Sequence, residues 1–140
     1  MADRRHARGL IDTSIVIDME SIDPNHLPVE LAVSAVTLAE LAAGPHATTD
    51  GAERARRQDR LQRAEATFEP LPVDGGVARA YGRVCATVFA AGRKARGRRA
   101  LDLLIAATAL AAGLPLYTRN ADDFSELDGL LEIVTVAPSA

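Results

Sequence analysis

Short apolar runs alternate with longer stretches of helical period along the chain. The runs that predict strands are residues 9–11, 31–34, 71–73, 116–118 and 131–136. Pro70 and Pro72 flank and interrupt the third run, which restricts that strand to the edge of a sheet. A strand, helix, strand, helix order favours parallel pairing, because parallel strands need long crossover connections. The pattern therefore predicts an α/β fold with a central, mostly parallel sheet flanked by helices.

Helical patterns fill the intervals between the predicted strands. They cover residues 13–20, a segment opening at Thr37, residues 51–68, a segment capped by Asp74, and residues 101–112. Within the fourth pattern, apolar side chains recur at the spacing of one buried helix face, at Val77, Tyr81, Val84 and Val88. Gly113 follows the last pattern at the position where a left-handed glycine ends a helix.

Length and composition indicate one globular domain spanning residues 1–140. Of the 140 residues, 48% are apolar and 25% charged, which excludes a disordered chain. The 16 basic and 19 acidic residues give a net charge of −3, which argues against a simple basic coat protein for nucleic acid. A local basic patch remains compatible with that total.

Cysteine content and hydropathy favour the cytoplasm. Cys85 is the single cysteine, so the chain has no internal disulfide and no zinc cluster built on cysteines. The longest uncharged run, residues 103–118, contains Gly113 and Pro115 and is shorter than the ~20 apolar residues of a membrane-spanning helix. We therefore expect no membrane association.

Acidic residues occur where predicted strands end and predicted helices begin. Asp12 directly follows the first apolar run, Glu40 and Asp102 fall in the first turns of two predicted helices, and Asp122 and Asp123 follow the fourth run. In a parallel sheet these positions share one edge, where ligands bind. Carboxylates without histidine or cysteine beside them suit hard cations such as Mg²⁺ or Mn²⁺.

Each acid other than Asp12 also has a purely structural interpretation. Thr37 and Glu40 have the spacing of a capping box, and the helix dipole favours Asp102 in a first turn. Asp122 and Asp123 are compatible with ordinary loop acids or a helix cap. Ending a buried strand in Asp12, by contrast, brings no packing benefit.

Four segments resemble, in order, the motifs of PIN-domain ribonucleases, and most closely those of VapC-type toxins from bacterial toxin–antitoxin pairs. They are Leu10-Ile-Asp12-Thr-Ser14, Ser34-Ala-Val-Thr37-Leu-Ala-Glu40-Leu, Arg99-Ala-Leu-Asp102-Leu-Leu-Ile-Ala106-Ala and Leu116-Tyr-Thr118-Arg-Asn120-Ala-Asp-Asp123-Phe124. Together they cover nearly the whole chain. The resemblance implies a PIN-like fold of three layers.

The resemblance also implies the site residues. The acids that it makes both catalytic and metal-ligating are Asp12, Glu40, Asp102 and Asp123. We prefer Asp123 to Asp122 because it directly precedes Phe124. Thr13 and Asn120 are expected to orient the site through hydrogen bonds.

The activity that the resemblance implies is hydrolysis of RNA phosphodiesters by a Mg²⁺-activated water, with Mn²⁺ as a substitute. Such an endoribonuclease needs no histidine base, and we predict that His6, His26 and His46 are exposed. The family further implies single-stranded or looped RNA as substrate, for example tRNA, together with a cognate antitoxin and a homodimer.

RNA binding beside an acidic cleft requires arginines. The segment leading into the Asp102 helix supplies the candidates, which are Arg93, Arg96, Arg98 and Arg99. A solvated loop is the alternative for this segment. For the arginine-rich helix of residues 51–68, a solvated face or an antitoxin contact is expected rather than RNA. With only 4% aromatic residues, base stacking should contribute little.

Two other functions fit parts of the sequence. One is a non-catalytic α/β interaction module in which the acids only cap helices. The other is a Mg²⁺-dependent phosphotransfer domain, but a haloacid-dehalogenase-type enzyme has a second acid where Ser14 stands. A receiver domain would need a lysine after a late strand, whereas Lys94 lies in an arginine run.

Overall fold

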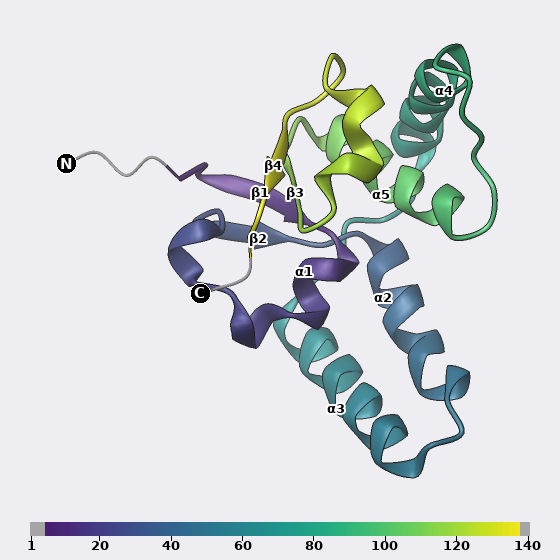
Figure 1. Cartoon of the computed structure of the whole chain (residues 1–140). Helices are drawn as coiled ribbons and strands as arrows, with labels where there is room; N and C mark the ends of the chain where they lie inside the picture. Colours follow the sequence, from purple (N-terminus) through teal and green to yellow (C-terminus); the bar gives the residue numbers. More distant parts are fainter. Residues whose placement is uncertain (1–4, 138–140) are drawn as a thin grey trace.

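The computed structural model of the chain describes residues 5–137. Its four strands are β1 (Arg8–Ile11), β2 (Glu30–Ala32), β3 (Leu116–Thr118) and β4 (Ile133–Thr135). They form one sheet in the order β2-β1-β3-β4, and every pair is parallel (Figure 1). The predicted parallel α/β sheet is therefore confirmed.

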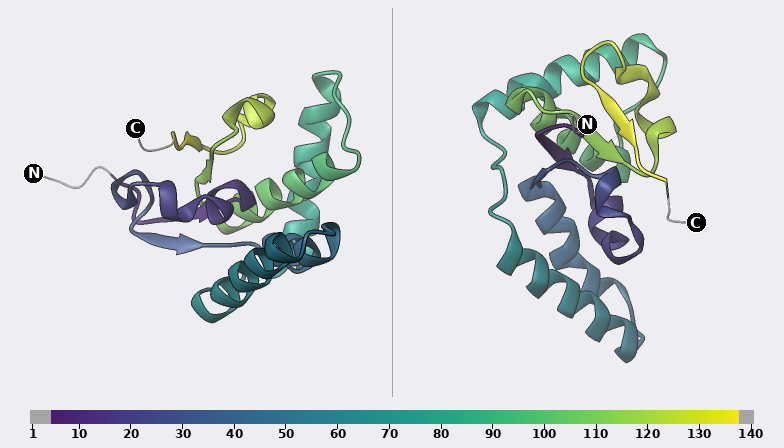
Figure 2. Two further views of the ribbon diagram at one scale, coloured as in Figure 1. Left: turned by 60° about the horizontal axis from the view of Figure 1, so that its bottom comes forward. Right: turned by 90° about the vertical axis from the view of Figure 1, so that its left-hand side faces the viewer.

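Helices cover both faces of this sheet. The α-helices are α1 (Thr13–Ile17), α2 (Ala35–Ala43), α3 (Gly51–Thr67), α4 (Gly75–Ala90) and α5 (Arg98–Ala112). Short 3-10 helices complete the connections: η1 (Met19–Ser21), η2 (Pro24–His26), η3 (Gly44–Ala47) and η4 (Ala121–Leu127). Helices α4 and α5 pack against each other, while α2 and α3 form a hairpin on the opposite side of the molecule (Figures 1 and 2).

Two apolar cores lie on opposite faces of the sheet, because successive strand side chains alternate in direction. In β1, Leu10 packs into the core shared with α4 and α5, and its neighbour Ile11 packs into the core shared with α1. Leu116 and Tyr117 of β3 divide in the same way. The fold thus has three layers, as predicted.

The helix patterns read from the sequence are confirmed in α4 and α5. Val77, Val84 and Val88 are buried along one face of α4, and Tyr81 of the same predicted stripe is half-buried against that core. Gly113 ends α5 in the left-handed conformation, with φ of 68°. The apolar run 103–118 forms α5 and β3 inside the fold, and none of the helices within residues 5–137 is long and apolar enough to cross a membrane.

The predicted edge strand at residues 71–73 is wrong. Only an isolated parallel bridge forms there, in which the Leu71 N–H donates to the Val33 carbonyl at 2.8 Å and the Ala35 N–H donates to the Leu71 carbonyl at 2.8 Å. Pro70 and Pro72 have no N–H groups, so the ladder cannot extend in either direction.

The capping box predicted at Thr37 and Glu40 is also wrong. Helix α2 begins earlier, because the Ser34 hydroxyl accepts a hydrogen bond from the Val36 N–H at 3.0 Å and acts as the N-cap. Glu40 consequently lies in the second turn of α2. Helix capping therefore does not explain why position 40 carries an acidic residue.

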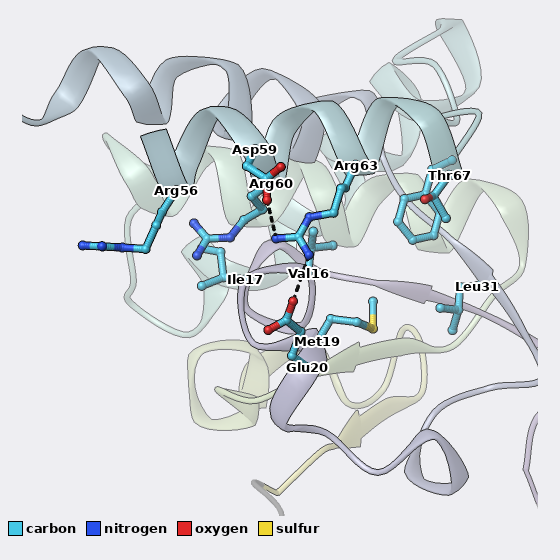
Figure 3. A pocket seen from close by; sticks show the side chains of 12 residues that line it. Val16, Ile17, Met19, Glu20, Leu31, Arg56, Asp59, Arg60, Arg63 and Thr67 are labelled. Carbon is cyan, nitrogen blue, oxygen red and sulfur yellow. Dashed lines mark hydrogen bonds and ion pairs between the residues drawn. The ribbon is translucent and has the colours of Figure 1, made fainter. Parts of the chain in front are cut away.

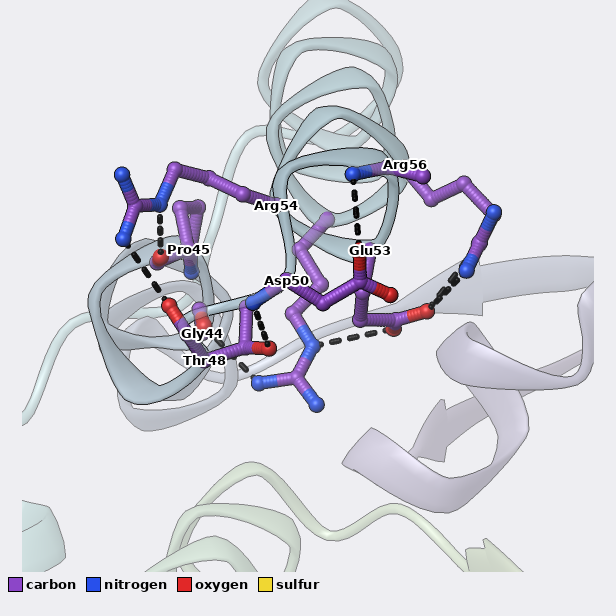
Figure 4. A network of polar contacts seen from close by, with 9 residues as sticks. Gly44, Pro45, Thr48, Asp50, Glu53, Arg54 and Arg56 are labelled. Carbon is purple, nitrogen blue, oxygen red and sulfur yellow. Dashed lines mark hydrogen bonds and ion pairs between the residues drawn. The ribbon is translucent and has the colours of Figure 1, made fainter.

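Arginines of α3 tie this helix to the turn that precedes it. Arg54 donates from Nε to the Pro45 carbonyl at 3.1 Å and from Nη2 to the Thr48 carbonyl at 2.9 Å (Figure 4). Arg57 donates to the Gly44 carbonyl at 2.9 Å. Part of the arginine-rich face is thus structural, and the α2–α3 hairpin is held in one geometry.

Candidate active site

The four predicted acids meet where the strand order changes direction. The chain leaves β1 for β2 on one side and later returns to β3 on the other side of β1, which is the arrangement that opens a crevice at the carboxyl ends of parallel strands. A pocket of about 270 Å³ lies there. The acids that line it are Asp12, Glu40, Asp102 and Asp123. Thr13, Ser14 and Asn120 line it as well, and Asp122 does not.

Asp12 is the N-cap of α1 and is buried. Its Oδ1 accepts hydrogen bonds from the Ile15 N–H at 3.2 Å and from the Ser14 hydroxyl at 2.5 Å. Burial raises the pKa of Asp12, and these hydrogen bonds oppose the rise. The N-cap of α1 is therefore the acid itself, and α1 ends at Ile17, earlier than the helical pattern of residues 13–20 predicted.

Glu40 is oriented by a buried pair of threonines. The Thr13 hydroxyl donates to Oε1 of Glu40 at 2.9 Å, and it lies 3.1 Å from the hydroxyl of Thr37. Thr13 thus occupies the orienting position that the sequence predicted. Thr37 is an additional neighbour that the sequence assigned only to helix capping. Its position three residues before Glu40, on the same helix face, is the signal that could have identified it.

Asp102 interacts electrostatically with the other acids of the pocket. Burial, followed by the negative charges of Glu40, Asp12 and Asp123, raises its pKa to about 6, and Arg98 opposes the shift. Helix α5 begins at Arg98 rather than near Leu101, so Asp102 lies in its second turn and not the predicted first turn. The helix dipole therefore gives little reason for an acid there.

Asp123 and Asn120 come from the segment after β3. Asp123 is exposed at the rim of the pocket, and its N–H donates to the Asn120 carbonyl at 3.0 Å. The Asn120 N–H donates to the Thr118 hydroxyl at 3.0 Å. These main-chain hydrogen bonds shape the turn that brings Asp123 toward the other acids.

The four arginines predicted to hold RNA have different environments. Arg98 lines the carboxylate pocket. Arg99 donates to the Asp123 carbonyl and forms an ion pair with Glu126, so its guanidinium is occupied by the protein itself. Arg93 and Arg96 are exposed and do not line this pocket. Only Arg98 is placed to meet a phosphate beside the acids.

The donor set of the pocket fits a hard divalent cation, because it consists of carboxylate oxygens whose charges repel one another. As the side chains stand, no group of three or more acidic, histidine or cysteine residues within 5–137 has an arrangement that could hold a metal ion. Hydrogen bonds from Ser14 and Thr13 occupy oxygens of Asp12 and Glu40. Each of these two carboxylates keeps a second oxygen that could bind a cation.

A larger groove of about 420 Å³ lies between α1 and α3 and contains none of the four acids (Figure 3). His6, His26 and His46 are exposed, as predicted, and none of them lines either the groove or the carboxylate pocket. The smaller pocket is therefore the candidate for chemistry.

Comparison with known proteins identifies the family. The PIN-domain family model matches residues 9–130. The chain belongs to the PIN-domain family. Ribonuclease VapC5 of Mycobacterium tuberculosis is 39% identical over 135 residues, which are 93% of this chain and 96% of that relative. Ribonuclease VapC4 of the same organism is 34% identical over 132 residues, 92% of this chain and 97% of that relative.

Solved structures show that the whole PIN domain is shared. The crystal structure of the toxin–antitoxin system VapBC-5 from Mycobacterium tuberculosis matches with a TM-score of 0.81 and 39% identity, over 93% of this chain and 99% of that one. A toxin–antitoxin complex from Klebsiella pneumoniae matches with a TM-score of 0.62 and 27% identity, over 91% and 96% of the two chains. The resemblance of the four motifs to VapC-type toxins is therefore confirmed.

Proposed function

We propose that this PIN-domain chain is a metal-dependent endoribonuclease and the toxin of a toxin–antitoxin pair. The observation that carries the proposal is the convergence of four carboxylates on one pocket at the switch point of a parallel sheet. The near full-length similarity to ribonucleases VapC5 and VapC4 supports RNA as the substrate. The reaction is hydrolysis of an RNA phosphodiester.

Mg²⁺, with Mn²⁺ as a substitute, would be held by Asp12, Glu40, Asp102 and Asp123. When bound, such an ion supplies an activated water and neutralises charge on the transferring phosphoryl group. Within the pocket, Ser14 and Thr13 fix the carboxylates of Asp12 and Glu40 by donating hydrogen bonds to them. Such supporting hydrogen bonds keep ligands oriented before a cation arrives.

Arg98 is the residue of the pocket that offsets the carboxylate charge. It stabilises the ionised form of Asp102, and its exposed guanidinium can meet a phosphate oxygen at the rim. Without such a cation, the polyanionic RNA would approach a site that is itself negatively charged. Arg98 therefore opposes the rise in the pKa of Asp102 and is placed to attract the backbone of the RNA.

The partner is a cognate antitoxin. Both structural relatives described above are solved as toxin–antitoxin complexes, and this chain shares their fold over at least 90% of its length. A homodimer and structured RNA substrates such as tRNA complete the proposal, as does action in the cytoplasm. The phosphotransfer alternative is disfavoured because the Ser14 hydroxyl hydrogen bonds to Asp12 where that chemistry places a second acid.

The test is RNA cleavage by the purified chain with Mg²⁺, with EDTA, and with Mg²⁺ restored after EDTA. Asp12→Asn and Asp123→Asn should each lower the cleavage rate by at least about a hundredfold, the scale of losing a group that stabilises the transition state. Asp122→Asn is the matched control, since Asp122 neighbours Asp123 but does not line the pocket. Cleavage that resists EDTA and persists in Asp12→Asn would contradict the proposal.

A further inference from the structure

A second groove continues from the carboxylate pocket toward the α2–α3 hairpin. It has a volume of about 370 Å³. It shares four lining residues with the carboxylate pocket, namely Thr13, Ile17, Glu40 and Arg98. From there it extends along the end of α2 and η3 to Arg57 and Arg60 of α3. The two cavities therefore form one path along which an extended chain could lie.

Helix α3 contains one arginine that has no hydrogen-bond or ion-pair partner among the described residues 5–137. Of its five arginines, Arg54 and Arg57 bind main-chain carbonyls of η3 and the following loop. Arg56 pairs with Glu53, and Arg63 pairs with Glu20 and Asp59. Within residues 5–137, Arg60 makes no hydrogen bond and no ion pair, although it is half-buried. A partly desolvated guanidinium favours an anionic partner.

Arg60 and Arg98 border the same groove from two different elements, α3 and α5. Arg98 also makes no hydrogen bond within the described part of the chain. Of the two acids that line the groove, Glu53 is paired with Arg56 and Arg57, and Glu40 accepts a hydrogen bond from the Thr13 hydroxyl. The path leading away from the carboxylates thus presents Arg60, which has no ion-pair partner among residues 5–137, and the exposed Arg98 beside the acids.

We propose that this groove binds the single-stranded RNA that flanks the scissile bond, with Arg60 and Arg98 holding backbone phosphates. The inference rests on the proposed ribonuclease function and names where its substrate lies. It differs from the sequence-based expectation for the arginine-rich helix, which was a solvated face or an antitoxin contact rather than RNA. None of the described residues that line the groove is aromatic, so the groove recognises the backbone and not the bases.

The neighbouring groove between α1 and α3 has different chemistry. Its floor includes Val16 and Met19, and its rim is closed by the contacts of Arg63 with Glu20 and Asp59 (Figure 3). Arg60 stands between the two grooves, but only the groove of about 370 Å³ leads to the carboxylates. Because Arg60 borders the groove that leads to the carboxylates, its position favours a nucleic acid strand as the occupant of that groove.

Binding of a fluorescein-labelled, mixed-sequence single-stranded RNA tests the proposal, with Kd measured over a series of salt concentrations in EDTA. Arg60→Gln should weaken binding about tenfold and reduce the slope of log Kd against log salt by about 0.7, the value for one phosphate contact in a single strand. Arg60→Lys should restore part of the affinity. Arg63→Gln, on the same helix but paired with Glu20 and Asp59 outside the groove, should change neither quantity appreciably.

Equal losses in Arg60→Gln and Arg63→Gln would overturn the proposal, because the effect would then reflect the general charge of α3. Unchanged RNA affinity in Arg60→Gln would overturn it too, and weakened binding of oligoglutamate in the same variant would assign Arg60 to an acidic protein partner. If the unmodified chain binds and cleaves RNA while Arg60→Gln behaves identically, only the groove assignment fails. If the unmodified chain neither binds nor cleaves RNA, the proposed function fails as well.

Discussion

Arg99, at the start of α5, forms an ion pair with Glu126 of η4, whose side chain is only 8% exposed. The same guanidinium donates to the main-chain carbonyl of Asp123. Since α5 carries Asp102 and η4 carries Asp123, this contact fixes the segments of two site acids relative to each other. Arg99 is therefore a positioning residue of the pocket.

Replacing Arg99 should disturb both stability and activity. Arg99→Gln leaves the Glu126 carboxylate largely buried without a counter-charge, which should lower the free energy of unfolding by about 2–3 kcal/mol. Urea denaturation measures this change, and RNA cleavage should show a lower kcat with little change in KM. The exposed Arg96→Gln is the control and should unfold as the unmodified chain does. Equal unfolding curves for both variants would contradict the positioning role.

The raised pKa of Asp102 makes the stability of the cation-free protein depend on pH. With a pKa of about 6 when folded and 3.8 as the reference for the unfolded chain, the folded state binds the proton more tightly. The stabilising effect of protonation is complete below about pH 4 and is lost as the pH rises through about 6. At neutral pH, the ionised Asp102 carboxylate therefore destabilises the folded protein.

Asp102→Asn should accordingly stabilise the protein in EDTA at neutral pH while abolishing RNA cleavage. The gain in the free energy of unfolding should be about 1–2 kcal/mol above pH 7, after allowance for solvent screening, and should vanish near pH 4. Denaturant unfolding across this pH range measures it. A difference between the two proteins that does not vary with pH would refute the electrostatic origin.

The hydroxyl of Thr13 should matter more for activity than for folding. Thr13→Val keeps the shape of the side chain but removes the hydrogen bond to Glu40, so the carboxylate loses its orientation. We expect cleavage to fall about tenfold or more, as for other supporting residues of ligand sites, and stability to fall by about 1 kcal/mol. Steady-state cleavage and urea unfolding test the two effects.

Thr87→Val provides the matched control for that experiment. Thr87 donates to the Arg83 carbonyl within α4, far from the carboxylate pocket along the chain and outside its lining. Its replacement should leave the cleavage rate unchanged. If both valine variants lose activity equally, the loss comes from general destabilisation and not from Glu40.

Local patterns sufficed to predict the features that depend on neighbouring residues. Asp12 directly after an apolar run, and Gly113 directly after a helical one, each lie where the sequence places them. The predicted start of α2 at Thr37 is wrong, because Ser34 and Thr37 are both residues that can act as N-caps. In the structure β2 ends at Ala32, and Ser34 is the N-cap. Helix boundaries of this kind depend on the sheet and not on the local sequence.

Contacts between distant residues could not be predicted from local patterns. Arg99 belongs to a basic run that is typical of a phosphate-binding loop, yet its partner Glu126 lies 27 residues away. Arg60 has the same sequence character as Arg56 and Arg63, but Glu53, Glu20 and Asp59 pair with those two arginines, and Arg60 has no ion-pair partner within residues 5–137. The distinction between structural and available arginines therefore required the tertiary structure.

Gly9 is required by the close packing of β1 against β3. A Cβ atom at this position would lie 2.7 Å from Cε1 of Tyr117 and 3.1 Å from Cγ of Pro28. Tyr117 is 3% exposed, so its ring has little room to move away. Gly9→Ala should therefore destabilise the protein by about 1–3 kcal/mol through overpacking. Because β1 leads directly into Asp12, the cleavage rate should fall as well.

Thermal unfolding and RNA cleavage test the role of Gly9, with Gly129→Ala as the control. No atom of the described residues would lie within 4 Å of a Cβ at Gly129, so that variant should unfold as the unmodified chain does. Adding Tyr117→Leu to Gly9→Ala removes the ring that the new methyl group meets, and part of the lost stability should return. The absence of any such coupling would show that Gly9 is needed for a reason other than the packing of β1 on Tyr117.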